Sequence, residues 1–67
     1  MTMINLAEFY HEAGKKLELR GMHSEAIEKY HSAINQGYGN SNLYFDLGRC
    51  YLALGYEEKA NRCFSQI

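Results

Sequence analysis

Hydrophobic residues recur along the chain at intervals of three and four, in four separate stretches. Residues at this spacing lie on one side of an α-helix, because a helical turn takes about 3.6 residues. No stretch shows the alternation that a half-buried β-strand requires. The pattern therefore predicts four helices and no β-sheet. Its positions are Phe9, Tyr10, Ala13, Gly14 and Leu17; Ala26, Ile27, Tyr30, Ala33 and Ile34; Leu43, Tyr44, Leu47, Gly48 and Tyr51; and Ala60, Cys63, Phe64 and Ile67.

Glycines and small polar residues separate these stretches. Gly21 and Gly55 follow the first and the third, where glycine readily adopts the left-handed conformation that ends a helix. We expect the Gly37–Gly39 pair to end the second helix. The expected N-caps are Ser24 for the second helix and Asn40 or Ser41 for the third. The expected ion pairs at i,i+4 are Glu12–Lys16, Glu25–Lys29 and Glu58–Arg62.

The whole pattern repeats after 34 residues. The matched pairs are Tyr10 with Tyr44, Gly14 with Gly48, Gly21 with Gly55 and Ala26 with Ala60. Internal periods of about 20 to 50 residues indicate stacked repeat architectures. We therefore expect a single all-α domain over residues 1–67, built from two tandem antiparallel helix-turn-helix hairpins. The first repeat spans about 7–40 and the second, incomplete one about 41–67.

The glycines inside the helices need a structural reason, because each costs about 1 kcal/mol relative to alanine. Gly14 and Gly48 lie in the middle of the first helix of each repeat. A missing side chain there lets the partner helix approach closely. We expect the bulky Tyr30 and Phe64 to fill the space between the hairpins, so that small residues face large ones twice.

The composition narrows the class of protein. With 67 residues the chain is near the lower size limit for a domain that folds alone. Cys50 and Cys63 allow at most one disulfide, so we interpret them as reduced, with a bridge between them as the alternative. Seven basic and eight acidic residues are interspersed and give a net charge of −1. This balance argues against a nucleic-acid partner. No apolar run is long enough to span a bilayer and no signal peptide is visible, so we expect a cytoplasmic protein without membrane insertion.

Candidate chemistry is sparse. His11, His23 and His31 are scattered, and no Cys-x-x-Cys pair accompanies them, so no zinc site is indicated. No nucleophile motif and no phosphate-binding glycine loop occurs. We therefore predict a protein that is not an enzyme, with no catalytic, metal or cofactor site. The histidines are expected on the solvent side and the cysteines in the core.

These residues resemble the tetratricopeptide repeat (TPR) family. Its pattern of an aromatic residue, Leu-Gly, Tyr, Gly, Ala and a second aromatic residue matches Tyr44, Leu47-Gly48, Tyr51, Gly55, Ala60 and Phe64. The first repeat offers Tyr10, Ala13-Gly14, Leu17, Gly21, Ala26, Tyr30 and Ala33. The resemblance covers residues 7–67, with Tyr38 in the place where the family usually has proline.

The resemblance implies a scaffold that binds a peptide or a helix of a partner protein in a concave groove lined by the first helix of each repeat. Phe45 and Leu52 are the best apolar contacts, with tolerated surface residues as the alternative. The residues that match groove positions are Glu8, His11, Glu12, Lys15, Glu18, Asn42, Phe45, Asp46, Arg49 and Leu52. One subclass holds the carboxylate of chaperone tails, but His11, Lys15 and Asp46 stand where it uses Lys, Asn and Asn. An aspartate there would repel a carboxylate, so we exclude that ligand.

A second hypothesis is self-association. The second repeat lacks the end of its second helix, which leaves Phe64 and Ile67 facing the place of a further repeat. Cys63, Phe64 and Ile67 are then candidates for a contact with a second copy or with neighbouring repeats, giving a homo-oligomer or a longer array. The partner itself is not identified by the sequence.

Overall fold

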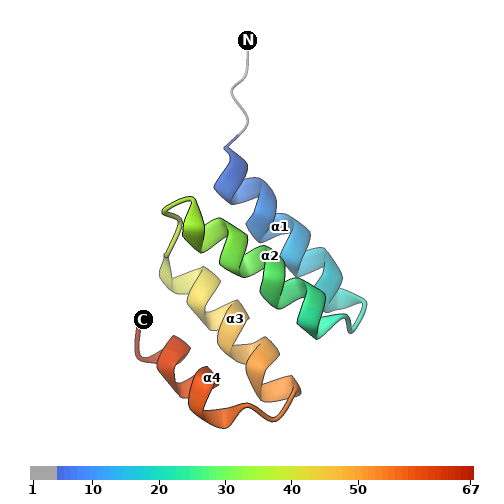
Figure 1. Cartoon of the computed structure of the whole chain (residues 1–67), viewed down its shortest axis with the longest axis vertical. Helices are drawn as coiled ribbons and strands as arrows, with labels where there is room; N and C mark the ends of the chain where they lie inside the picture. The colour runs from blue at the N-terminus through green and yellow to red at the C-terminus, as the bar shows by residue number, and fades with distance from the viewer. Residues whose placement is uncertain (1–4) are drawn as a thin grey trace.

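The computed structural model describes residues 5–67, and these form four helices (Figure 1). The helices are α1 (Leu6–Leu19), α2 (His23–Asn35), α3 (Ser41–Ala53) and α4 (Glu57–Phe64). No β-strand occurs among the described residues. The predicted all-α fold of helical hairpins is therefore confirmed.

The helices pack in the order in which they follow along the chain. The helix α1 packs along α2 and α3 packs along α4, which makes two hairpins. The helix α2 contacts α3, and α1 contacts α3 over a smaller area, so the second hairpin lies against both helices of the first. Figure 1 shows α3 between α2 and α4. This placement brings the faces of α1 and α3 together on one side of the molecule.

The two turns within the hairpins have the same geometry. After α1, Met22 N donates to Leu17 O at 3.0 Å and Gly21 N donates to Glu18 O at 2.9 Å, with Gly21 at φ +77°. After α3, Gly55 occupies the equivalent place at φ +82°. This double hydrogen bond around a left-handed residue is the Schellman motif, which supplies donors to the last carbonyls of a helix. The predicted role of both glycines is confirmed.

The helix α2 begins two residues earlier than the sequence suggested. Its N-cap is Met22, which makes no side-chain capping bond, and its first residue is His23. Met22 O already accepts from Ala26 N at 3.0 Å, which is the first bond of the helix. The same residue thus closes the turn after α1 and opens α2. The prediction of Ser24 as N-cap was wrong, because the first helical bond is already accepted by Met22 O and Ser24 lies inside α2.

In the connection between the hairpins, Asn40, Gly37 and Gly39 each have a different role. Asn40 caps α3, since its side-chain oxygen accepts from Leu43 N at 2.8 Å, as expected. Gly37 is left-handed at φ +84° and ends α2, but Gly39 is not. A side chain at Gly39 would begin 3.1 Å from the hydroxyl of Tyr44, so Gly39 makes room for that ring. The expected glycine pair is therefore one helix-ending residue and one packing residue.

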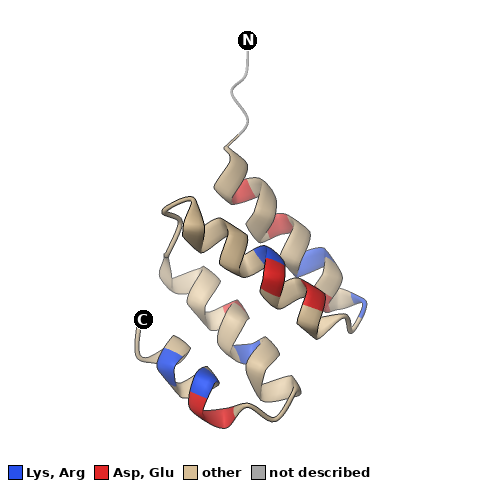
Figure 2. Ribbon diagram, in the orientation of Figure 1, with Lys and Arg blue, Asp and Glu red and all other residues tan. Residues whose placement is uncertain are grey.

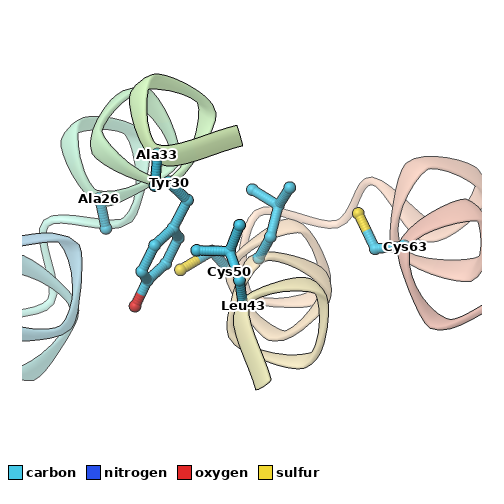
Figure 3. Packing of buried hydrophobic residues seen from close by; sticks show 7 residues of the cluster. Ala26, Tyr30, Ala33, Leu43, Cys50 and Cys63 are labelled. Atoms are coloured by element: carbon cyan, nitrogen blue, oxygen red, sulfur yellow. The ribbon is translucent and has the colours of Figure 1, made fainter. Parts of the chain in front are cut away.

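The core lies between the hairpins. Its largest fully buried side chains are Tyr30 from α2 and Leu43, Leu47 and Cys50 from α3. Figure 3 shows Ala26 and Ala33 beside Tyr30 on α2, and Cys63 projecting from α4 toward α3. Burial of these apolar surfaces supplies the main stabilising free energy, at roughly 25 cal/mol per Å². The two hairpins consequently share one core.

The repeated glycines do allow close packing. A Cβ atom at Gly14 would lie 2.5 Å from a ring carbon of Tyr30, and one at Gly48 would lie 2.5 Å from a ring carbon of Phe64. Each ring therefore lies on the glycine of its own hairpin. Tyr30 also reaches the core between the hairpins, as expected, whereas Phe64 is only partly buried. The small-against-large contact predicted from the repeat is confirmed at both glycines, but the expectation that Phe64 also fills the space between the hairpins was wrong, because Phe64 lies outside the shared core.

Two other expectations fail. Phe9 is 59% exposed, although its match Leu43 is fully buried, because Leu43 packs on α2 and no described helix occupies the corresponding place beside Phe9. Within residues 5–67, none of the three expected i,i+4 ion pairs forms, and Glu12 instead contacts Lys15 at 3.3 Å. Such exposed pairs contribute little to stability.

Candidate interaction site

The face shared by α1 and α3 is hollowed. A cavity of about 330 Å³ lies between them, and Tyr38 from the connection after α2 also lines it. It brings together seven of the expected groove residues from both helices: Glu8, His11, Glu12, Lys15, Asn42, Phe45 and Asp46. Residues four apart on α1 and on α3 face the same side because the helix repeats every 3.6 residues. The repeat register thus places matched residues along one groove.

The remaining groove candidates lie farther along the two helices. Arg49 and Glu18 line an adjoining cavity of about 400 Å³, together with Lys15 and Leu19. Leu52 is 48% exposed and lines neither cavity. The two cavities share Lys15, so the hollow continues along the contact between α1 and α3.

A chain of polar contacts crosses the floor of this groove. His11 Nε2 lies 2.8 Å from Oδ2 of Asp46, and the nitrogen must be the donor because an ionised carboxylate only accepts. The other oxygen of Asp46 accepts from Arg49 Nη2 at 3.1 Å. His11 is also flanked by the rings of Tyr30 and Tyr38, each with its centroid 5.7 Å away. These contacts join the first helix of one repeat to the first helix of the next.

Glu18 extends the same network into the core. One of its carboxylate oxygens accepts from Tyr30 Oη at 2.7 Å, and the other accepts from Arg49 Nε at 2.7 Å. Burial by itself raises the pKa of Glu18, but the hydrogen bonds from Arg49 and Tyr30 outweigh it, so the pKa lies below its ordinary value. The hydrogen bond to Glu18 is in turn the main cause that raises the pKa of Arg49. Glu18 is therefore ionised and paired at neutral pH.

Tyr30 and Cys50, two other neighbours of Glu18, stay in their neutral forms. Burial, followed by the hydrogen bond to Glu18, raises the pKa of the Tyr30 hydroxyl far above its ordinary value. Burial and the negative charge of Glu18 raise the pKa of the Cys50 thiol to about 12. A buried neutral thiol is a poor nucleophile, because the thiolate is the reactive form. These groups therefore pack and donate hydrogen bonds.

The network corrects the expected role of three groove residues. His11 is 6% exposed, so the expectation that the histidines lie on the solvent side was wrong for this one. Asp46 and Arg49 face the groove but already have intramolecular partners. A signal in the sequence did exist: His11, Glu18 and Tyr30 are polar where the second repeat has Phe45, Leu52 and Phe64. Comparing the repeats for differences, rather than for matches, would have indicated a polar junction.

The side chains left available for a ligand are on the rim of the groove. Phe45 is 49% exposed, with the guanidinium of Arg49 5.4 Å from its ring centroid. Glu8, Glu12 and Asn42 are also exposed. The rim thus offers one aromatic surface among carboxylates and an amide.

The three candidates for self-association, Cys63, Phe64 and Ile67, differ in how much of each side chain is exposed. Ile67 is 61% exposed, whereas Cys63 is buried at 7% and burial raises the pKa of its thiol. Cys63 is therefore mostly covered, so Phe64 and Ile67 are the members of this set that present more surface to a second copy. Phe64 is partly buried on Gly48, and its ring centroid lies 6.0 Å from that of Phe45. Phe45 and Phe64 form one apolar surface at the edge of the second hairpin.

Both cysteines are free, as expected. No three His, Cys, Asp or Glu side chains among residues 5–67 gather in a way that could hold a metal ion. None of the described helices is both long and apolar enough to cross a membrane.

Comparisons with known proteins give no family for this chain. No protein-family model matches it, and no match was found to a curated protein or to a solved structure.

Proposed function

We propose that this chain is a tetratricopeptide-repeat-like module of the cytoplasm that binds a peptide or a helix of a partner protein in the groove between α1 and α3. The observation that carries the proposal is the cavity of about 330 Å³, which residues of both helices line in matched register. Pockets of about 300 Å³ or more accommodate ligand groups of substantial size. The role is binding rather than catalysis, and it requires no cofactor.

The network beneath the groove supports this proposal. A binding face needs its walls held in fixed positions, because ordering them on binding would cost affinity. The contacts of His11 with Asp46 and of Glu18 with Arg49 join the two walls before any ligand arrives. Phe45 then supplies the apolar contact, since aromatic side chains contribute much of the binding energy at interfaces. Glu8 and Asn42 supply polar contacts on either side of the groove.

A peptide library selected on the wild-type chain tests this proposal. Selected peptides should shift the backbone amide signals of α1 and α3, and Phe45→Ala should weaken their binding at least about tenfold, as for a hot-spot residue. Tyr56→Ala is the matched control, because Tyr56 is an aromatic residue of similar exposure outside the groove. Peptides that bind Phe45→Ala as tightly as the wild type would show that the groove is not the site.

A second candidate function is self-association through the edge of the second hairpin. The observation that favours it is the adjacency of Phe45 and Phe64, with Ile67 also exposed on the last residues of the chain. At its junction with the second repeat, the first repeat has His11, Glu18 and Tyr30. The residues 34 positions later, on the outer edge of the second repeat, are Phe45, Leu52 and Phe64. A neighbour at this edge would therefore meet an apolar surface instead of a polar one.

Light scattering over a concentration series tests this second candidate. A dimer that appears with rising concentration and disappears in Ile67→Lys would support it. Leu19→Lys places the same charge at an exposed leucine at the end of α1 and should leave the molar mass unchanged. A monomer at every concentration would remove self-association from consideration.

A further inference from the structure

A second and larger hollow lies on the other side of α3. Its volume is about 470 Å³, and residues of α2, α3 and α4 line it. The helix α3 contributes Tyr44, Leu47 and Tyr51 to it, but Asn42, Phe45 and Asp46 to the groove. At about 100° per residue, Tyr44 and Asp46 project in nearly opposite directions. We call this hollow the α2–α4 cleft, and it is separate from the groove.

The cleft exists because α2 and α4 do not touch one another among the described contacts. Both pack on α3, which lies between them in Figure 1. Leu47 and Cys63 are buried and form its floor, and the half-buried rings of Tyr44 and Tyr51 form its walls. An apolar floor of this kind would accept an apolar side chain of a ligand.

The rim of the cleft is basic. His31 comes from α2, and Lys59 and Arg62 come from α4, whose basic positions are visible in Figure 2. No aspartate or glutamate lines the cleft. The acidic residues at the start of α4, Glu57 and Glu58, line a different hollow beside Gly55. The rim is therefore positively charged in a molecule whose net charge is −1.

Lys59 and Arg62 form no ion pair with a carboxylate within residues 5–67. The ammonium of Lys59 lies 5.7 Å from the ring centroid of Tyr51 and 5.4 Å from that of Tyr56, a cation–π arrangement that leaves its charge in place. Arg62 forms no ion pair within residues 5–67, since the expected contact with Glu58 is not made. His31 Nε2 lies 2.9 Å from Tyr51 Oη. Lys59 and Arg62 thus place positive charge on the α4 side of an apolar floor, and no carboxylate lines the cleft.

We propose that the α2–α4 cleft binds an acidic peptide segment, with an apolar side chain on the floor and flanking carboxylates at Lys59 and Arg62. Carboxylates are the complementary groups for a guanidinium and an ammonium, and an arginine holds them through paired hydrogen bonds. The groove on the opposite side is lined by three carboxylates, Glu8, Glu12 and Asp46, and by one ammonium, that of Lys15, so it suits an acidic peptide less well. The two faces of α3 therefore differ in charge.

The test uses a defined probe and the whole chain. The probe is a capped peptide with a central phenylalanine flanked on each side by aspartate and glutamate, and its control has asparagine and glutamine in those places. Titrated into the isotopically labelled protein, the acidic peptide should shift the amide signals of Tyr44, Tyr51 and Cys63. The amide peptide should bind at least about tenfold more weakly, as expected when the charged contacts are lost.

Charge variants identify the groups that hold the probe. Arg62→Gln should weaken binding about twofold to fivefold, which is the effect of one exposed ion pair, and Arg62→Lys should recover part of it. Removing both Lys59 and Arg62 should weaken binding by about the product of the two single effects. Arg20→Gln is the matched control, because it removes the same charge from the turn after α1.

The proposal has clear contrary outcomes. It is overturned if millimolar acidic peptide causes no shifts, if the shifts fall on Glu8, Asn42 and Phe45, or if the amide peptide binds equally well. An equal loss in Arg20→Gln and Arg62→Gln would also overturn it, since the attraction would then belong to the whole surface. Phe45→Ala should leave this binding unchanged, so the result is independent of the groove.

Discussion

Single side chains determine how the two repeats of this chain meet. Glu18 accepts hydrogen bonds from Tyr30 and Arg49, and Asp46 accepts from His11 and Arg49. Hydrogen bonds to charged groups contribute about 1.5–3 kcal/mol when their surroundings exclude water, and less where one partner is exposed. Arg49 is half exposed, whereas Glu18 is largely buried, so the bond between Glu18 and Tyr30 contributes the most. The junction is therefore specified by polar geometry as well as by apolar burial.

The lowered pKa of Glu18 makes stability depend on pH. Because the folded-state pKa lies below the ordinary value of 4.5, the stabilisation is complete above about pH 4.5 and is lost as the pH falls toward the folded-state value. Glu18→Gln should lower the free energy of unfolding by about 1–2 kcal/mol at pH 7. At pH 3 the difference between the two proteins should be smaller.

Urea unfolding of both proteins at the two pH values measures this difference. Comparing the pair, rather than the wild type alone, separates Glu18 from the other carboxylates that titrate over the same range. A difference that stays constant between pH 7 and pH 3 would mean that the charge of Glu18 does not stabilise the fold.

The two helix-interior glycines should respond differently to the same substitution. Gly14→Ala directs a methyl group onto Tyr30, which is fully buried and held by Glu18, so the ring cannot move away. Overpacking costs about 1–3 kcal/mol, while alanine recovers about 1 kcal/mol of helix propensity. The balance of these two effects is a net loss of up to about 2 kcal/mol, and we expect Gly14→Ala near the upper end because the Tyr30 ring is held in place.

Gly48→Ala is the matched variant. The ring of Phe64 that it would meet is only partly buried and has no hydrogen bond, so it can shift toward solvent. The propensity gain should then offset the contact, and the urea midpoint should change little. Equal losses at Gly14 and Gly48 would contradict this account of the two rings.

At the scale of the helices, the number and type of elements were predicted correctly from the sequence. The N-terminus of α2 was predicted wrongly. The 34-residue repeat and the glycines Gly21 and Gly55 indicated two hairpins with equal turns, because these features depend on local geometry. Ser24 has the residue type of an N-cap, but Met22 opens α2 within the preceding Schellman motif. Met22 belongs both to the motif that ends α1 and to the first turn of α2, and a search for one cap at each helix end does not detect such a shared residue.

The N-caps provide a test at this scale. Asn40→Ala removes the hydrogen bond from Leu43 N to the cap of α3 and should cost about 1 kcal/mol. Ser24→Ala should change stability by no more than a few tenths of a kcal/mol, because the serine is exposed and caps nothing. The urea midpoints of Asn40→Ala and Ser24→Ala, each compared with that of the wild type, measure the two losses of stability. A larger loss for Ser24→Ala would mean that α2 is capped in solution as the sequence first suggested.

At the scale of the whole molecule, the groove could be predicted in outline but not in detail. The repeat register was enough to place Glu8, Glu12, Asn42 and Phe45 along one face, because matched residues on stacked helices point the same way. The burial of His11 could not be predicted in this way. It depends on Asp46 and on the rings of Tyr30 and Tyr38, which come from three other elements. The α2–α4 cleft was missed for the same reason, since its basic rim combines residues of two repeats.

The shared core predicts that the two hairpins unfold together. Cys50 lies in the cluster that joins the hairpins, and Cys63 lies between α3 and α4 (Figure 3). Tyr30, Leu43 and Leu47 belong to the same cluster, so opening either hairpin exposes it. Repeat units that share a large interface behave cooperatively, whereas weakly coupled units open one at a time.

Thiol labelling along a urea series measures this coupling. Cys63→Ala leaves Cys50 as the single reporter of the junction, and Cys50→Ala leaves Cys63 as the reporter of the second hairpin. Without urea both thiols should react slowly, because both are buried and burial raises their pKa values. When each urea concentration is scaled to the variant's own unfolding midpoint, both reporters should become reactive at the same point. Labelling of Cys63 well below that midpoint, with Cys50 still protected, would mean that α4 opens alone and that the second hairpin does not depend on the core between the hairpins.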